Sequence, residues 1–321
     1  MKKSAKIWLI IASLLVIVGA VMFAVSLIAY NGDFTKFATA KYQTNMHEIS
    51  EEFTDISIDT ETADIKIFPS DDNKCKVVCY ETEKESHSVE VENGTLKIRY
   101  VDTRAWYEYI GINISSSRIT VYLPEKEYSS LKIKGSTGNV YIPADFSFDS
   151  IDIKASTGDV HIEAASSESI KIKADTGDIN LISINTSSLD LGVSTGKISV
   201  TDINCGGDIK IEISTGKVSL RNISCKNLIS SGDTGKITLK NVTASEKFSI
   251  TRSTGDVTFD ACDASEILVS TSTGDVRGTL LSGKVFVTDT STGKTDVPKS
   301  TSGGICEITT STGDIEISIT E

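Results

Sequence analysis

The chain has 321 residues, a formal net charge of −12, six cysteines and three histidines. Such an acidic surface repels nucleic acid and anionic lipid headgroups, so we expect no nucleic-acid partner. The cysteines form no CxxC pair, and none stands beside a histidine. The composition therefore disfavours a structural zinc site or a redox motif, and no cofactor is expected.

The N-terminus carries three lysines and then an uncharged apolar segment, residues 7–30. At about 1.5 Å per residue, this segment is long enough to cross a hydrocarbon core of about 30 Å. We predict a single-pass transmembrane helix over 7–30, with a cytoplasmic tail (1–6) and an extracytoplasmic remainder, because positive charge stays inside. The alternative is a cleaved signal peptide, whose apolar region is shorter, about 7–15 residues, and ends at a small-x-small site.

The strongest signal in the sequence is a Thr-Gly dipeptide that recurs every 19 or 20 residues. Segments of alternating apolar and polar residues flank each copy, which is typical of strands with one buried face. One such unit cannot bury its apolar side chains alone, whereas stacked units about 4.8 Å apart can. The sequence predicts an all-β, right-handed parallel β-solenoid (β-helix) of about ten coils over residues 131–321. The turn glycines are Gly138, Gly158, Gly177, Gly196, Gly216, Gly235, Gly255, Gly274, Gly293 and Gly313.

Equivalent positions of successive coils form three predicted ladders of inward side chains. We expect the coils to stack in chain order, so that the last strand, from Asp314, is the open edge, with acidic side chains that oppose end-to-end pairing. A monomer is therefore expected. The first ladder is Leu131, Ile151, Ile170, Leu189, Ile209, Leu228, Phe248, Ile267, Phe286 and Cys306; the second is Val140, Val160, Ile179, Ile198, Val218, Ile237, Val257, Val276, Thr295 and Ile315; the third is Ile142, Ile162, Leu181, Val200, Leu220, Leu239 and Phe259.

The preceding residues lack the regular repeat. Residues 31–52 are predicted to be a stalk or linker, and residues 53–130 an N-terminal cap with irregular first coils. A degenerate unit has Ala63 where later coils have glycine, and Asn93-Gly94 indicates a hairpin turn.

These features resemble the bacterial β-strand-repeat family catalogued as a putative adhesin, a domain of unknown function. The resemblance covers about residues 45–321. Its most specific part is the segment Ile119-Thr-Val-Tyr-Leu-Pro, then Leu131-Lys-Ile, then serial Ser-Thr-Gly-Asp-Val. It implies a surface-exposed β-solenoid and supplies no catalytic or binding residues.

Three aromatic residues in the cap, Trp106, Tyr107 and Tyr109, are the best candidates for contact with a ligand or partner. Aromatic side chains near an arginine are typical of interface hot spots. The alternative is that they cover the open end of the core.

The residue after each Thr-Gly forms a second candidate surface. Asp159 and Asp178, or Asp256 and Asp275, could bind Ca²⁺, and the block Lys197, Lys217 and Lys236 could bind an anion. Calcium prefers six to eight oxygen ligands, and this repeat lacks the glycine-rich nonapeptide that wraps calcium in other solenoids. A solvated face is the expected role, and no metal site is assigned.

Cys205 and Cys225 fall nine residues after their repeat glycines, which places them on adjacent coils. A Cα separation of about 4.8 Å permits a disulfide, but parallel Cβ atoms at that spacing exceed the usual separation of about 3.8 Å. Small buried cysteines are the favoured interpretation, and a disulfide is the alternative.

The predicted function is that of a non-enzymatic, membrane-anchored adhesin or envelope surface-interaction protein. Its partner would be a cell-wall component, a host surface or an envelope protein. One alternative is an envelope-stress accessory or sensor that acts through partners in the membrane. A carbohydrate-active β-helix enzyme is disfavoured, because the coils carry no insertions that could wall a cleft around convergent catalytic residues.

Overall fold

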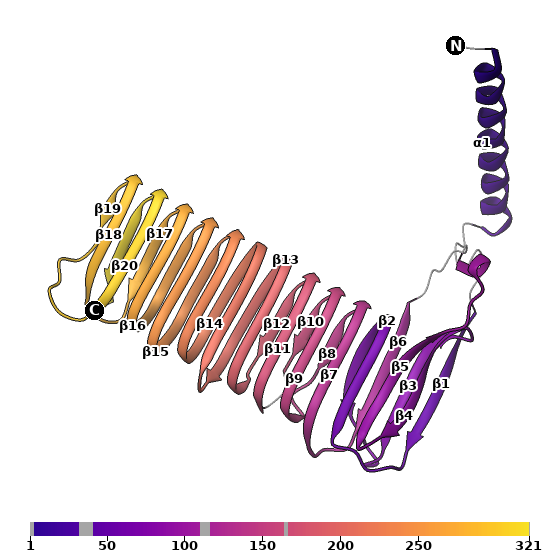
Figure 1. Ribbon diagram of the computed structural model, residues 1–321, viewed down its shortest axis with the longest axis horizontal. Helices are drawn as coiled ribbons and strands as arrows, with labels where there is room; N and C mark the ends of the chain where they lie inside the picture. Colours follow the sequence, from indigo (N-terminus) through magenta and orange to yellow (C-terminus); the bar gives the residue numbers. More distant parts are fainter. Residues whose placement is uncertain (1–2, 32–40, 110–115, 164–165, 321) are drawn as a thin grey trace.

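The computed structural model describes residues 3–31, 41–109, 116–163 and 166–320. An N-terminal helix, α1 (Lys3–Ala29), stands apart from a long β-rod (Figure 1). Its segment Ala5–Ala29 has a mean hydropathy of 2.8, and none of it is buried in the protein. Length and composition suit a membrane span, and a signal sequence has the same properties. The predicted tail (1–6) begins outside the described residues, and the helix already includes Lys3.

The strands wind into a β-solenoid of about nine turns, which confirms the predicted fold class (Figure 1). In chain order the elements are β1 (Tyr42–Ile49), β2 (Asp55–Pro69), β3 (Cys75–Thr82), β4 (Glu85–Glu92), β5 (Thr95–Asp102), the 3₁₀ helix η2 (Trp106–Tyr109), β6 (Ser117–Leu123), β7 (Glu127–Thr137), β8 (Val140–Ile142), β9 (Ser147–Thr157), β10 (Val160–Ile162), β11 (Ser166–Thr176), β12 (Ile179–Ile182), β13 (Asn185–Cys205), β14 (Asp208–Thr234), β15 (Ile237–Thr254), β16 (Val257–Thr273), β17 (Val276–Leu280), β18 (Lys284–Thr292), β19 (Thr295–Asp296), β20 (Gly304–Thr312) and β21 (Ile315–Ile319).

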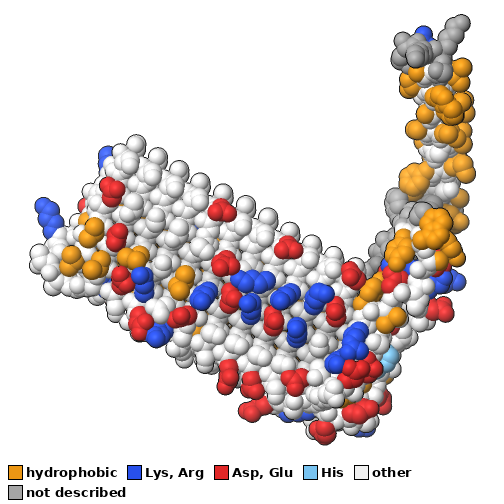
Figure 2. Space-filling view, in the orientation of Figure 1, with side chains coloured by type: hydrophobic (Ala, Val, Ile, Leu, Met, Phe, Trp, Pro, Cys, Tyr) orange, Lys and Arg blue, Asp and Glu red, His pale blue; other side chains and the backbone are white. Residues whose placement is uncertain are grey.

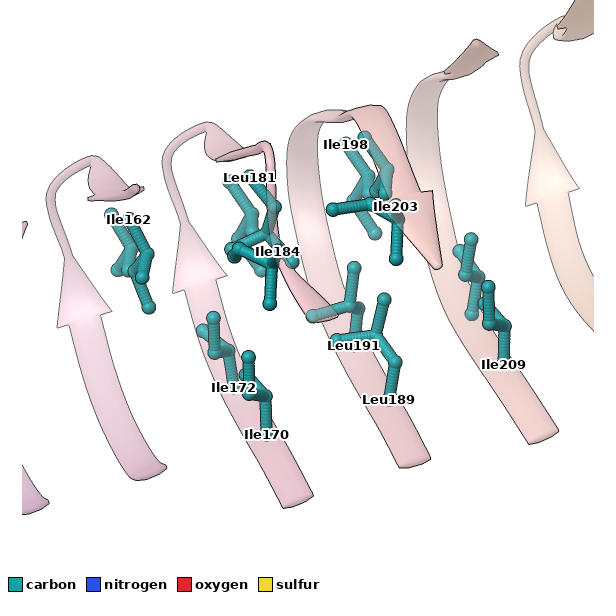
Figure 3. Packing of buried hydrophobic residues seen from close by; sticks show 14 of the residues in the cluster. Ile162, Ile170, Ile172, Leu181, Ile184, Leu189, Leu191, Ile198, Ile203 and Ile209 are labelled. Atoms are coloured by element: carbon teal, nitrogen blue, oxygen red, sulfur yellow. The ribbon is translucent and has the colours of Figure 1, made fainter. Parts of the chain in front are cut away.

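Each coil pairs in parallel with the equivalent residues of its neighbour. Leu131 lies opposite Ile151, which lies opposite Ile170, as the repeat predicts. All members of the three predicted ladders are buried except Phe286 and Thr295. Figure 3 shows how these side chains fill the interior between successive coils. The stacked ladders therefore supply one continuous apolar core, which a single coil could not form.

At the Thr-Gly corner, the backbones of neighbouring coils approach each other closely. Nine of the ten repeat glycines have a positive φ, and Gly293 in the outermost coil is the exception. A Cβ atom added to Gly216 would lie 1.6 Å from the carbonyl oxygen of Gly196, which leaves no space for a side chain. Glycine is therefore required both for the backbone conformation and for the close approach.

The C-terminal coils do not stack in chain order. The last coil, β20–β21, lies between β16–β17 and β18–β19, so β18–β19 forms the end of the rod (Figure 1). The prediction that the strand from Asp314 is the open edge is therefore wrong. The buried faces explain the order: β20–β21 buries Cys306, Ile308 and Ile315, whereas the end coil has the exposed Thr295 at a ladder position. Placing the more apolar coil inside removes more apolar surface from water.

The other end of the rod has the same inversion. Strand β2 lies between β5–β6 and β7–β8, although β5 and β6 follow it in the chain. Antiparallel strands close this end: β4 pairs with β5, and β3 joins β6 to β1. The hairpin at Asn93-Gly94 is confirmed, with positive φ at both residues as a type I′ turn requires.

Strand β1 corrects the predicted stalk over residues 31–52. Residues 42–49 form the outer strand of the cap, and residues 32–40 lie outside the described residues. This strand is half-buried and has no sustained apolar alternation, so its pairing with β3 decides its conformation and the sequence pattern does not reveal it.

Long basic side chains extend across neighbouring coils at three places, and at two of these they cover a glycine. Lys173 crosses Gly192 to reach Glu212 at 3.0 Å, and Lys284 reaches Asp263 at 2.6 Å. Arg252 is buried against Gly232 and donates to Ser230 Oγ at 2.8 Å. Burial lowers the pKa of the Arg252 guanidinium to about 10.

The requirement for glycine at the corner can be tested at Gly216. We expect Gly216→Ala to lower the free energy of unfolding by at least about 2 kcal/mol, since the new methyl group meets a backbone oxygen at a positive φ. Urea denaturation measures the change. The matched control is Gly206→Ala, where nothing lies within 4 Å of the added Cβ. Equal effects of the two substitutions would contradict the steric explanation.

Candidate functional site

The three predicted contact residues lie together on η2. Trp106 is 79% exposed, and Tyr107 and Tyr109 are each 59% exposed. The rings of Trp106 and Tyr107 meet edge to face, with centroids 5.9 Å apart. These side chains do not cover the open end of the core, because η2 contains no buried residue. The three side chains are therefore exposed on the surface of the cap.

Ion pairs and hydrogen bonds fix this short helix to the cap. Glu108 accepts a hydrogen bond from the backbone N–H of Ala105 at 2.8 Å, as in a capping box, and pairs with Lys84. Arg104 pairs with Asp102 at 2.7 Å and with Glu85 at 2.9 Å. Hydrogen bonds from the Arg104 side chain hold the pKa of Asp102 well below its usual range. The aromatic side chains therefore project from a helix whose position on the cap is fixed by these ion pairs and hydrogen bonds.

The aromatic helix lies on the edge of the cap where the chain enters from α1. Tyr42, the first residue of β1, pairs with Thr82 at the end of β3. Two residues later, the Lys84 carbonyl accepts a hydrogen bond from Thr103 N–H at 2.9 Å, just before η2. Figure 1 shows the short helix on the side of the cap that faces α1.

The aspartates after Thr-Gly have a structural role along the corner. Asp159 Oδ1 accepts a hydrogen bond from Asp178 N–H, and Asp178 Oδ1 accepts one from Lys197 N–H, each at 2.8 Å. In the same way, Asp256 Oδ1 accepts a hydrogen bond from Asp275 N–H, and Asp275 Oδ1 accepts one from Asp314 N–H. Each carboxylate therefore supplies an acceptor to the next coil. Asn139 does the same for Asp159 N–H, which shows that the position needs an oxygen acceptor and no charge.

If Asp178 acts only as a hydrogen-bond acceptor, substitution by alanine and substitution by asparagine should affect stability differently. We expect Asp178→Ala to cost about 1 kcal/mol, one hydrogen bond, whereas Asp178→Asn stays within about 0.5 kcal/mol of the wild type. Urea denaturation with and without calcium measures both. Stabilisation of the wild type by calcium that Asp178→Asn abolishes would instead indicate that the aspartates bind the metal.

The three lysines that follow Thr-Gly, at positions 197, 217 and 236, also lie on successive coils. Lys197 and Lys217 lie in register, and β13 and β14 continue through their corners without a break. Lys236 occupies the same position on the next coil, where the strand is interrupted. These side chains form part of an exposed ridge.

A second set of lysines lines a groove that the sequence analysis did not identify. Lys134, Lys154 and Lys173 lie in register on β7, β9 and β11. They line a groove of about 280 Å³ together with Ser136 and Ser156 and with three acidic residues, Asp59, Glu61 and Asp175. Lys173 pairs with Asp190 and Glu212, whereas no acid among the described residues lies within ion-pair distance of Lys134 or Lys154. Figure 2 shows basic side chains in a band over the middle of the rod, with acidic side chains among them.

A buried polar network inside the cap was also missed. His87 lies 2.9 Å from Thr60 Oγ1 through Nε2 and 2.7 Å from Glu81 Oε2 through Nδ1. Asn45 donates to the other Glu81 oxygen at 2.7 Å, so the network joins β1, β2, β3 and β4. The only sequence signal was the inward alternation that leads from Cys79 to Glu81 on β3.

This network has the order of a hydroxyl–imidazole–carboxylate triad but no access for a substrate. Thr60, Glu81 and His87 are 3%, 1% and 5% exposed. The Cys79 sulfur, Glu81 and His87 also lie within 4.8 Å of one another, as metal ligands could. However, both His87 nitrogens are already paired, and burial raises the pKa of the Cys79 thiol to about 12. We interpret the network as a structural connection between the cap strands.

The cysteines agree with the favoured sequence interpretation. All six are free and buried in this structure, including Cys205 and Cys225. Burial raises the pKa of the Cys225 thiol to about 12, which keeps it protonated at neutral pH.

Comparison with known proteins shows the family. The family model described as Toastrack DUF4097 matches residues 53–212 and 206–321. The chain belongs to this family. Both matches lie in the cap and solenoid, so the family relationship concerns the rod and not α1. None of the curated proteins compared with the chain is significantly similar to it.

Several solved structures are similar to this Toastrack-family chain. A putative adhesin from Bacteroides fragilis is 15% identical, with a TM-score of 0.43, and the match covers 87% of this chain and 97% of that chain. A putative adhesin from Parabacteroides distasonis is 12% identical, with a TM-score of 0.48 and coverage of 87% and 98%. A putative lipid binding protein from the same organism is 14% identical, with a TM-score of 0.37 and coverage of 88% and 98%.

Proposed function

We propose that this protein is a non-enzymatic adhesin or surface-interaction protein, anchored in the cell membrane by α1 with its β-solenoid outside the cytoplasm. The rod binds a polymeric partner at the cell surface, and the groove beside Lys134 and Lys154 is its contact surface.

The observation that carries this proposal is the in-register repetition along the groove. Lys134 and Lys154 present like charges on directly paired strands, an arrangement that costs tenths of a kcal/mol. Asp59, which lies in register with Lys134 on β2, shares the groove, but neither lysine forms an ion pair with an acid among the described residues. Their spacing of about 4.8 Å suits a ligand with repeated anionic groups, such as a phosphate- or carboxylate-bearing cell-wall glycan. Ser136 and Ser156 add hydroxyl groups to the same groove.

A non-enzymatic role is supported by the shape of the described surface. The described strands follow one another in regular coils, with no long insertion between the described repeat coils to wall a cleft. Where the described residues do form a hydroxyl–imidazole–carboxylate arrangement, at Thr60, His87 and Glu81, it is buried. Catalysis requires such groups to converge where a substrate can reach them.

Anchoring by α1 is tested on the full chain with a tag at each end. We expect both tags to remain on one polypeptide that stays in the membrane after washing at alkaline pH, because the uncharged helix spans the bilayer. Loss of the N-terminal tag from the mature protein would instead identify the segment as a cleaved signal peptide.

Binding is tested with the soluble rod, residues 41–321, which contains the entire buried core. We expect saturable binding to anionic cell-wall glycans. The double variant Lys134→Glu, Lys154→Glu should weaken binding about tenfold or more, since two attractive contacts become repulsive. Surface plasmon resonance on immobilised glycans measures the affinity.

The matched control changes the same charges on the ridge, Lys197→Glu with Lys217→Glu, which should leave the affinity unchanged. A loss of binding in the ridge variant alone would place the contact at the corner stripe and contradict the groove. Trp106→Ala with Tyr107→Ala shows whether the aromatic helix contributes. If the rod binds no cell-wall or host polymer, the adhesion proposal fails.

A further inference from the structure

We propose that the aromatic helix η2 rests on the outer face of the bilayer that carries α1, with Trp106, Tyr107 and Tyr109 at the level of the lipid headgroups. The cap is thereby docked on the membrane, and the rod is held in a defined orientation. This inference depends on the proposed anchoring of α1 but not on any ligand of the rod.

The exposure of the three aromatic side chains points to a partner other than water. Trp106, at 79% exposed, and Trp8 in α1 are the two tryptophans of the chain. Tryptophan and tyrosine combine an apolar ring with a polar group, and both are enriched where the bilayer meets water. Three such residues on one short helix form a compact surface suited to that boundary.

The chain connectivity keeps this surface close to the membrane. Helix α1 ends at Ala29, and β1 begins at Tyr42. The residues between them extend at most about 3.5 Å each, so the cap edge lies within reach of the bilayer. Because Tyr42 pairs with Thr82, and Lys84 contacts both Thr103 and Glu108, the entry point and η2 share this edge. In Figure 2, apolar side chains are exposed among charged ones on the part of the cap nearest α1.

The charges around η2 indicate whether docking depends on aromatic rings or on attraction to anionic lipid headgroups. Lys84 pairs with Glu108, and Arg104 pairs with Asp102 and Glu85, so these cations are already neutralised. Docking therefore depends on the aromatic rings and not on attraction to anionic headgroups, which polybasic segments use. A modest affinity is sufficient, because the anchor makes the contact intramolecular and raises the effective concentration of membrane surface.

The experiment uses the full chain in zwitterionic lipid vesicles, with Trp8→Phe so that Trp106 is the only tryptophan. We expect Trp106 emission to move to shorter wavelength, to be quenched by lipids brominated near the headgroups, and to be several-fold less sensitive to iodide in solution than a distal tryptophan. Added anionic lipid and salt should not strengthen these effects, since no free cation takes part.

The distal control carries Trp8→Phe, Trp106→Phe and Val287→Trp. Val287 lies on β18 in the end coil and is 54% exposed, so its tryptophan should remain accessible to iodide. Free N-acetyltryptophanamide gives a second, fully exposed reference if the distal substitution perturbs the end coil.

Two outcomes would overturn the proposal, and they are distinguishable. Protein that floats with the vesicles but has Trp106 as accessible as the distal tryptophan is anchored and not docked; the aromatic surface then serves a protein or glycan partner. Protein that fails to float with the vesicles overturns both the anchoring and the docking. Neither result depends on glycan binding by the rod.

Discussion

At every Thr-Gly corner, the backbone of one coil lies against a carbonyl oxygen of its neighbour, at a distance that no side chain could permit. This contact sets the register, because one misplaced residue would bring a Cβ atom into the same space. Once the corners are aligned, apolar side chains on either side fall into ladders. The core, the corner stripe and the lysine groove all depend on that alignment.

The two ends of the rod face a different constraint, because the terminal strands of a solenoid have unpaired backbone groups that could pair with another molecule. At the C-terminal end, the chain places an apolar coil inside and a threonine-bearing coil outside. At the N-terminal end, antiparallel strands and the buried His87 network close the core. Both ends place a segment out of chain order, which gives β2 and the coil β20–β21 a paired neighbour on each side.

The proposed functions divide the surface between the two ends of the chain. The cap carries its exposed aromatic residues on the edge next to α1, whereas the groove with Lys134 and Lys154 lies along the rod. A docked cap would hold the rod at a fixed angle to the membrane, so that the groove faces the surrounding envelope. Orientation and binding would then be properties of separate residues.

The sequence by itself determined the solenoid, the turn glycines and all but two members of the inward ladders, because in a stacked repeat the same residue pattern recurs in every coil. The aromatic cluster in the cap was also visible in the sequence, although its exposure was not. The order of the end coils, the pairing of β1 and the His87 network were decided only in the tertiary structure. In these places the competing arrangements have the same local pattern, and only the apolar area buried between distant segments distinguishes them.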